Sequence, residues 1–403
     1  MNILANSLCL LLIQSFIFIS VCQFVPDPRY EQTSILVNTK IYFFGGYTNN
    51  SNFTNEVLYL DLSSPLNTNE PLWVKNPIGI PSEEVLTTSC LSNIDNSTVF
   101  LIGGQALEQA KQIINAQLVY TFNSITSQWT TINTTGFYNY SIALSSLNLI
   151  NNVPTSRVSY TATLLNNSLI IYIGGFAQSD SGKTNVNMSE IQIFNLKSLS
   201  WSSMQINADK IESRNAHSAV LTNDGRIIIF GGSSTDETAR RTTLRARPDV
   251  AVLNTTILPY EWSIQNISLA NSPQSLCYHS AEIYNNIMII AFGIITSDQL
   301  QTTATFNNKI YLFDVQNYVW VSSTSPTTTS TIPTSTTEQT SSNNSSIALA
   351  IEIGIGVSGF IITLSLIIAG FAYYKYRKLR KTIVGMPGTD SYPIETPGTE
   401  SHK

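Results

Sequence analysis

Apolar and polar positions follow one another along this chain in a short pattern that returns five times. Each copy contains a run of five mostly apolar, β-branched or aromatic residues that ends at glycine or one residue before it. The runs are KIYFF (40–44), TVFLI (98–102), LIIYI (169–173), RIIIF (226–230) and IMIIA (287–291). Runs of this length and boundary predict buried strands rather than helices.

A second apolar run follows each of these positions and closes on an Asx residue. The closing residues are Asp61, Asn123, Asn195, Asn254 and Asp314. An Asx side chain can accept a hydrogen bond from the backbone two residues further on, so each second strand is predicted to end in a tight turn.

Glycine pairs and tryptophans set the frame of the repeat. The pairs are Gly45-Gly46, Gly103-Gly104, Gly174-Gly175 and Gly231-Gly232. A fifth, degenerate copy at Phe292-Gly293 has phenylalanine in place of the first glycine. One tryptophan follows each of these positions further along the chain. The five are Trp73, Trp129, Trp201, Trp262 and Trp320, which are all the tryptophans in the chain. Self-similarity at this period predicts stacked supersecondary units such as the blades of a β-propeller.

One further element precedes the glycines. Tyr160, His217 and Tyr278 each lie fourteen residues before the first glycine position, and Arg157 and Arg214 stand three residues before the first two of them. A strand starting there completes four strands per unit. In this register Tyr278 holds the fifth copy's position, and His279 is displaced from it by one.

The combined signature resembles the kelch repeat over about residues 24–322. The resemblance implies an all-β propeller of four-stranded blades, the fold of cytoskeletal, adhesion and galactose-oxidase-type kelch proteins. Five blades are recognisable, and the stretch from Thr131 to Pro154 leaves open a sixth, degenerate one.

The chain ends predict a type I single-pass membrane protein. Residues 1–22 have the apolar core of a signal peptide, and 23–322 form the propeller ectodomain. A Ser/Thr-rich stretch at 323–346 has the composition of an O-glycosylated stalk. Residues 347–374 are predicted to span the membrane, and the basic cluster from Lys375 to Lys381 keeps the short tail, 375–403, in the cytoplasm. The expected location is the plasma membrane, with retention in the secretory pathway as the alternative.

Sequons agree with this topology, because every one of them precedes the predicted span. The asparagines are Asn49, Asn52, Asn96, Asn133, Asn139, Asn166, Asn187, Asn254, Asn266, Asn343 and Asn344. They are candidate N-glycosylation sites. Within the span, Gly354 and Ser358 lie four residues apart and favour a helix pair, hence a dimer.

Composition narrows the function. Charged residues make up 12% of the chain and its net charge is −5, which argues against a nucleic-acid partner. Arg240, Arg241, Arg245 and Arg247 form the best charged candidate for a binding surface. Cys90 and Cys277 could pair in an oxidising compartment, but two small buried thiols are favoured.

Catalytic chemistry has no sequence support. Copper oxidases of the kelch type use two histidines and two tyrosines. Here His217 has a blade position, His279 is displaced by one residue from that position, and His402 lies in the tail. No metal-spaced Cys/His set, nucleophile elbow or phosphate loop is present. We therefore expect no cofactor and no enzyme, and a cell-surface recognition or adhesion module that binds a protein or glycan. The alternative is a tethered extracellular enzyme, a copper-radical oxidase or a carbohydrate-active protein.

Overall fold

The computed structural model describes ten segments of the chain. They are residues 23–49, 52–107, 113–115, 119–132, 154–155, 157–179, 182–235, 243–268, 270–300 and 303–324. The chain divides into two compact units, Met1–Thr327 and Thr328–Lys403, and every described residue lies in the first. The predicted signal peptide, stalk, span and tail, and most of the stretch proposed for a sixth blade, lie outside these segments.

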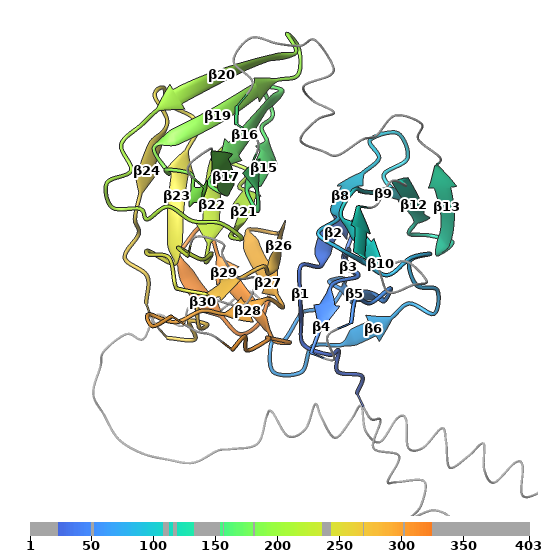
Figure 1. Ribbon diagram of the computed structural model, residues 1–403. Helices are drawn as coiled ribbons and strands as arrows, with labels where there is room; N and C mark the ends of the chain where they lie inside the picture. The colour runs from blue at the N-terminus through green and yellow to red at the C-terminus, as the bar shows by residue number, and fades with distance from the viewer. Residues whose placement is uncertain are drawn as a thin grey trace, which may run out of the picture. The chain divides into compact units, whose positions relative to one another are not determined.

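Five four-stranded antiparallel sheets make up the described fold, each from one continuous stretch of chain (Figure 1). Blade I contains β2 (Thr33–Val37), β3 (Lys40–Phe44), β5 (Val57–Asp61) and β6 (Trp73–Lys75). Blade II contains β8 (Thr88–Leu91), β9 (Thr98–Ile102), β12 (Val119–Asn123) and β13 (Gln128–Ile132). Blade III contains β15 (Thr161–Leu164), β16 (Leu169–Ile173), β19 (Glu190–Asn195) and β20 (Ser200–Gln205). Blade IV contains β21 (Ser218–Leu221), β22 (Arg226–Phe230), β23 (Val250–Asn254) and β24 (Glu261–Ser263). Blade V contains β26 (Ser280–Tyr284), β27 (Ile287–Ala291), β29 (Ile310–Asp314) and β30 (Val319–Val321).

These sheets confirm the predicted blade register. The five glycine-bounded apolar runs are the second strands β3, β9, β16, β22 and β27. All five Asx residues accept the predicted bond from the backbone N–H two residues on. Each tryptophan lies on the fourth strand of its blade.

The core consists of apolar side chains between neighbouring blades. Ile227 and Ile229 of blade IV pack against Ile171 and Ile173 of blade III, and Phe230 packs on the blade V side. Trp320 of blade V meets Phe230 edge to face, with 5.3 Å between ring centroids. This tryptophan thus fills the gap between two adjacent blades, as the resemblance implies, and it does so against the preceding blade.

Blades I and V meet without exchanging a strand. The Ser34 hydroxyl of β2 donates to the Glu282 carboxylate of β26 across 2.8 Å. After β30, Ser323 pairs with Asn67 in the loop before β6, and the Thr68 N–H donates to the Ser322 carbonyl. The first and last blades are therefore joined by side-chain and loop hydrogen bonds.

Candidate binding face

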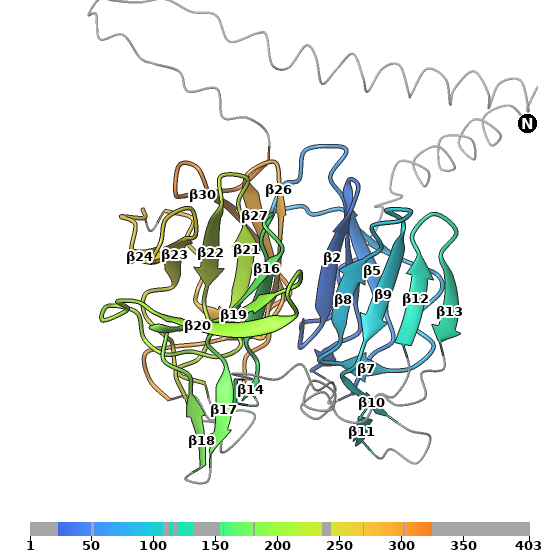
Figure 2. The ribbon, with the colours of Figure 1, turned by 90° about the horizontal axis from the view of Figure 1, so that it is seen from above.

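Short ribbons gather at the glycine end of the blades. In each blade the segment before the first strand pairs with the loop that follows the glycine position. The pairs are β1 (Arg29–Tyr30) with β4 (Tyr47–Thr48), β7 (Glu84–Val85) with β10 (Gln105–Leu107), β14 (Arg157–Val158) with β17 (Phe176–Ser179), Asn215 with Ser233, and β25 (Leu276–Cys277) with β28 (Ile294–Ile295). Two ribbons carry a third strand, β11 (Ile113–Asn115) and β18 (Gly182–Asn185), and Figure 2 shows both on the same side of the blades. We call this side the ribbon face.

The glycine pairs bring each blade against the ribbon segment of the next. The Gly232 N–H donates to the Leu276 carbonyl at 2.8 Å, and the Gly46 N–H donates to the Glu84 carbonyl at 2.9 Å. A Cβ on Gly231 would stand 2.1 Å from the Leu276 oxygen, and its φ is +66°. Glycine is required there by both the close approach and the left-handed backbone.

A chain of backbone hydrogen bonds joins the blades just beside these glycines. Each blade carries one non-glycine residue with positive φ before its first strand: Glu31, Leu86, Ser159, Ala216 and Tyr278. The backbone N–H of one such residue donates to the backbone carbonyl of its counterpart in the neighbouring blade, at 2.8–3.1 Å. The donor–acceptor pairs are Ala216–Ser159, Tyr278–Ala216, Glu31–Tyr278 and Leu86–Glu31. We call these five residues the axial relay. Because all five residues have nearly the same positive φ, they define equivalent positions in the five blades, whatever their side chains.

This alignment corrects the sequence register at blade V. Tyr278 belongs to the axial relay and matches Ala216, so His279 is the equivalent of His217. The Cβ atoms of both histidines face the second glycine of their own blade, Gly293 and Gly232. The count of fourteen residues was misleading because the β26–β27 hairpin of blade V (280–291) is one residue shorter than the β21–β22 hairpin of blade IV (218–230).

The two histidines link neighbouring first strands. Nε2 of His217 bonds the Thr161 hydroxyl at 3.1 Å, and Nε2 of His279 bonds the Ser218 hydroxyl at 2.7 Å. In blade I, Gln32 fills the same position, and its amide donates to the Ser280 hydroxyl at 3.1 Å. Burial lowers the pKa of both histidines to about 3, and Arg214 adds to the effect at His217. Both rings are therefore neutral structural links at ordinary pH.

Metal binding receives no support from this arrangement. Within the described segments, no group of three or more His, Cys, Asp or Glu side chains is placed to hold a metal ion.

The predicted arginines Arg157 and Arg214 are buried beneath the ribbon face. Arg157 pairs with Glu190 at 3.1 Å, and the equivalent Arg29 of blade I pairs with Glu56 at 2.5 Å. Arg214 instead donates to the backbone carbonyls of Glu212 and Gly231. Burial lowers the pKa of Arg214 to about 10, against the opposing charges of Asp249 and Glu212.

The candidate surface cluster of arginines is only partly described, because Arg240 and Arg241 lie outside the described segments. Arg245 pairs with Asp249, and Arg247 pairs with Asp298 at 2.6 Å. Arg245 also approaches Asp298 at 3.9 Å. The Arg247 N–H donates to Glu212. The two arginines therefore form an ion-pair network between the glycine-end loops of blades IV and V rather than an unpaired basic patch.

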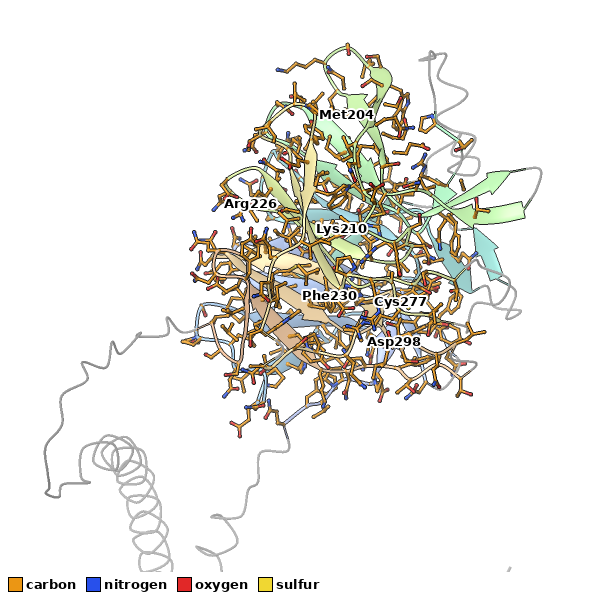
Figure 3. The ribbon with its side chains drawn as sticks, turned by 90° about the vertical axis from the view of Figure 1, so that its left-hand side faces the viewer. Met204, Lys210, Arg226, Phe230, Cys277 and Asp298 are labelled. Carbon is orange, nitrogen blue, oxygen red and sulfur yellow. The ribbon has the colours of Figure 1, made fainter. Side chains whose placement is uncertain are left out.

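Figure 3 shows Asp298 and Cys277 on one side of the molecule and Arg226 on the other.

The cysteines differ from each other and from the expectation of two equivalent buried thiols. Both cysteines of the described segments are free thiols. Cys277 is fully buried in β25, where burial raises its pKa, while Cys90 is exposed on β8. The expectation is wrong for Cys90, since its side of β8 is open to solvent among the described residues.

Sequons fall on loops at both ends of the blades. Asn49, Asn52, Asn96, Asn166, Asn187 and Asn266 are exposed, and Asn254 is half-buried at the end of β23. Asn133, Asn139, Asn343 and Asn344 lie outside the described segments. Glycosylation stays a prediction.

Sequence reasoning missed two carboxyl groups, of which Glu84 is buried and Glu282 half-buried. Glu282 lies on β26, and burial raises its pKa to about 7 against hydrogen bonds from Ser34 and the Leu36 N–H. Glu84 takes the place of the ribbon arginine in blade II, and burial raises its pKa to about 8. The sequence contained one signal for Glu84, because it stands at the repeat position where three other blades have arginine.

Repeated four-stranded sheets and a loop-built ribbon face define a β-propeller scaffold. A family model described as the KLHDC2/KLHL20/DRC7 Kelch-repeats domain matches residues 159–350. Together with the all-β fold, this match supports a kelch-type propeller.

Curated relatives share only part of their length with this chain. Acyl-CoA-binding domain-containing protein 4 of Arabidopsis thaliana is 22% identical over 52% of this chain and 28% of its own. Acyl-CoA-binding domain-containing protein 6 of Oryza sativa subsp. japonica is 25% identical over the same shares. The chain thus spans less than a third of these relatives. Among solved structures, that of YjhT is similar at a TM-score of 0.42 and 15% identity, covering 75% of this chain and 86% of that one.

Among the described residues, no helix has the length and apolar composition needed to cross a bilayer. The predicted span at 347–374 lies outside them.

Proposed function

We propose that this protein is a type I cell-surface recognition module whose ribbon face binds a protein or glycan partner. A propeller offers rigid strands under variable loops, the arrangement in which binding residues are usually found on loops. The ion-pair network and the ribbons with a third strand supply chemically distinct loops on this one face.

The observation that carries the proposal is the position of the chain ends. The Gln23 amide donates to the Pro71 carbonyl, and Ser323 pairs with Asn67, so both ends of the described propeller reach the loop before β6. That loop lies at the end of blade I opposite to the glycines. The described chain therefore leaves the propeller at the end opposite to the ribbon face, which keeps that face clear of the segment that follows residue 324.

Topology is tested on the full-length chain in intact cells. We expect an N-terminal tag placed after residue 23 to be accessible to antibody and a C-terminal tag to be hidden, with a mass loss after glycosidase treatment. A C-terminal tag that is accessible without permeabilisation would contradict the orientation.

Recognition is tested by saturable binding of cells displaying the full-length chain to unmodified cells. The ribbon-face variant is Val158→Glu with Leu86→Glu, whose side chains are 54% and 40% exposed. The matched control is Ile94→Glu, 93% exposed in the turn between β8 and β9 at the opposite end. We expect binding to fall about tenfold in the first and to persist in the control. Equal binding by both variants would reject the ribbon face, and no saturable binding by the unaltered chain would reject recognition.

A further inference from the structure

Blade I shows the complete environment of a ribbon arginine. Nε of Arg29 donates to the Asp27 carbonyl at 3.2 Å and Nη1 to the Gly45 carbonyl at 3.3 Å. Nη2 meets the Glu56 carboxylate at 2.5 Å. The Glu56 backbone carbonyl accepts from the Gly45 N–H, which fixes the acid at the start of the third strand.

Blade IV reproduces all of this except the last contact. Nε of Arg214 donates to the Glu212 carbonyl at 3.2 Å and Nη1 to the Gly231 carbonyl at 2.8 Å. The Asp249 carbonyl accepts from the Gly231 N–H, so Asp249 stands where Glu56 stands in blade I. Yet Nη2 of Arg214 has no hydrogen-bond partner among the described residues, although the side chain is 0% exposed.

The missing carboxylate is held by a second arginine. Nε of Arg245 donates to Asp249 Oδ1 at 2.8 Å, and its Nη2 bonds Oδ2. Arg245 is 28% exposed and lies on the loop after β22, where it pairs with Ser233. Two guanidinium groups therefore compete for one carboxylate, and the solvent-facing one holds it.

We propose that Asp249 is an exchangeable carboxylate and that Arg245 is a binding site for an acidic side chain of a partner protein. When the partner's carboxylate takes the two donors of Arg245, Asp249 turns to Nη2 of Arg214 and restores the pair seen in blade I. A planar carboxylate suits the fork of Arg245 in the same way as Asp249 does. The exchange also supplies a partner to a buried donor that now lacks one, which is otherwise unfavourable. This inference rests on the proposed function, because it places the partner on the ribbon face.

The surroundings favour a peptide over a densely charged polymer. The described charges near the site are balanced within the network, and the net charge of the chain is −5, so a polyanion would be repelled. Leu300, two residues beyond Asp298 on the neighbouring loop, is 59% exposed. An acidic residue beside an apolar one matches Arg245 and Leu300 together.

The first experiment determines the structure of the full-length Arg245→Gln variant. We expect an Asp249 carboxylate oxygen within about 3 Å of Arg214 Nη2. If Asp249 stays away from Arg214 once its competitor is gone, the exchange is wrong. Should Arg245→Gln fail to fold, Arg245→Lys provides the same comparison, because the ammonium cannot hold the carboxylate at two points.

The second experiment measures binding of the N-acetylated, C-amidated peptide Leu-Glu-Glu-Leu to the full-length chain. Its Gln-for-Glu analogue and trigalacturonic acid serve as comparison ligands. We expect the Glu peptide to bind, Arg245→Gln to weaken it about tenfold, and Arg226→Gln, on the opposite face, to leave it unchanged. Binding of the uronate but not the peptide would overturn the choice of partner. Peptide binding that Arg245→Gln leaves intact would overturn the site, while the cell-binding result with Val158 and Leu86 would still stand.

Discussion

At the scale of single residues, burial decides the charge state of the groups that join the first strands. His217 and His279 use Nε2 to bond a hydroxyl of the preceding blade. Both imidazoles stay neutral because a charged ring at these buried positions would lack the stabilisation that water provides. Glu282, on the same layer of first strands, is disfavoured as an anion for the same reason. The two residue types therefore respond to pH in opposite directions.

The variant His279→Gln should become more stable relative to the unaltered protein as pH falls. The pKa of His279 is about 3 in the fold and about 6.5 when unfolded, so the unfolded chain binds the proton first and stability is lost below about pH 6.5. The loss amounts to about 2 kcal/mol by pH 5. The amide introduced by this substitution would keep the bond to Ser218, as Gln32 bonds Ser280 in blade I. Urea unfolding at pH 7 and pH 5 measures the difference, and a pH-independent difference would contradict it.

The variant Glu282→Gln should show the reverse trend. A folded pKa of about 7 against about 4.5 in the unfolded chain means that stability is lost as pH rises through this window. The amide cannot ionise and still accepts from the Ser34 hydroxyl. We expect the variant to gain about 2–3 kcal/mol relative to the unaltered protein between pH 4.5 and pH 7. The same denaturation series tests this, and a gain that is largest at pH 4.5 would refute it.

At the scale of the element, the glycine pair sets how closely one blade approaches the next. Gly231→Ala would press a Cβ on the Leu276 backbone carbonyl and impose a left-handed conformation on alanine. We expect a loss of about 3 kcal/mol or more in the free energy of unfolding.

Gly225→Ala is the matched control. Gly225 also has positive φ, but its nearest neighbour is a side-chain methyl of Thr256 at 2.8 Å, which can move. We expect a loss of about 1–2 kcal/mol, measured by the urea midpoint. Equal losses would mean that the backbone conformation, and not the close approach, determines the requirement for glycine.

Blade V shows how the repeat changes when glycine is absent. Phe292 takes the first glycine position with φ +65°, and its bond to the Lys309 carbonyl lengthens to 3.5 Å, compared with 2.8 Å at Gly231. The ribbon arginine is replaced by Leu276 and the acid by Lys309 in the same blade. Arg29 of blade I lies over the Phe292 ring at 5.3 Å. Blade V therefore lacks the buried arginine–acid pair of blade I, and its Phe292 ring instead contacts Arg29 of the neighbouring blade.

The blade strands were predictable because their signals are local. Apolar runs, Asx turns and tryptophans depend on neighbouring residues, and they predicted the second, third and fourth strands correctly. The axial relay was not predictable, because Leu86 and Tyr278 adopt positive φ without being residues that favour it. His279 was misaligned because the first hairpin of blade V is one residue shorter than that of blade IV. The exchange at Asp249 depends on which of two arginines lies closer, and spacing in the sequence does not contain that information.

At the scale of the whole molecule, stability is expected to differ among blades. The second and third strands of blade IV are almost entirely buried, whereas β13 of blade II is nearly all exposed. Amides with few buried neighbours open more often. We expect β22, β23 and β27 to exchange hydrogen most slowly and β13 and β20 most rapidly. Hydrogen exchange followed by mass spectrometry measures this, and faster exchange in β22 than in β13 would contradict it.

The axial relay has a consequence for how such a protein can change over time. Its five positions carry an acid, an aliphatic residue, a hydroxyl, a methyl and a phenol, yet the bonds between them use only main-chain atoms. Mutation can therefore rewrite the chemistry at these sites one residue after another while the links between blades persist. Propellers of this architecture can therefore differ in the side chains at these positions while keeping the same backbone links between blades.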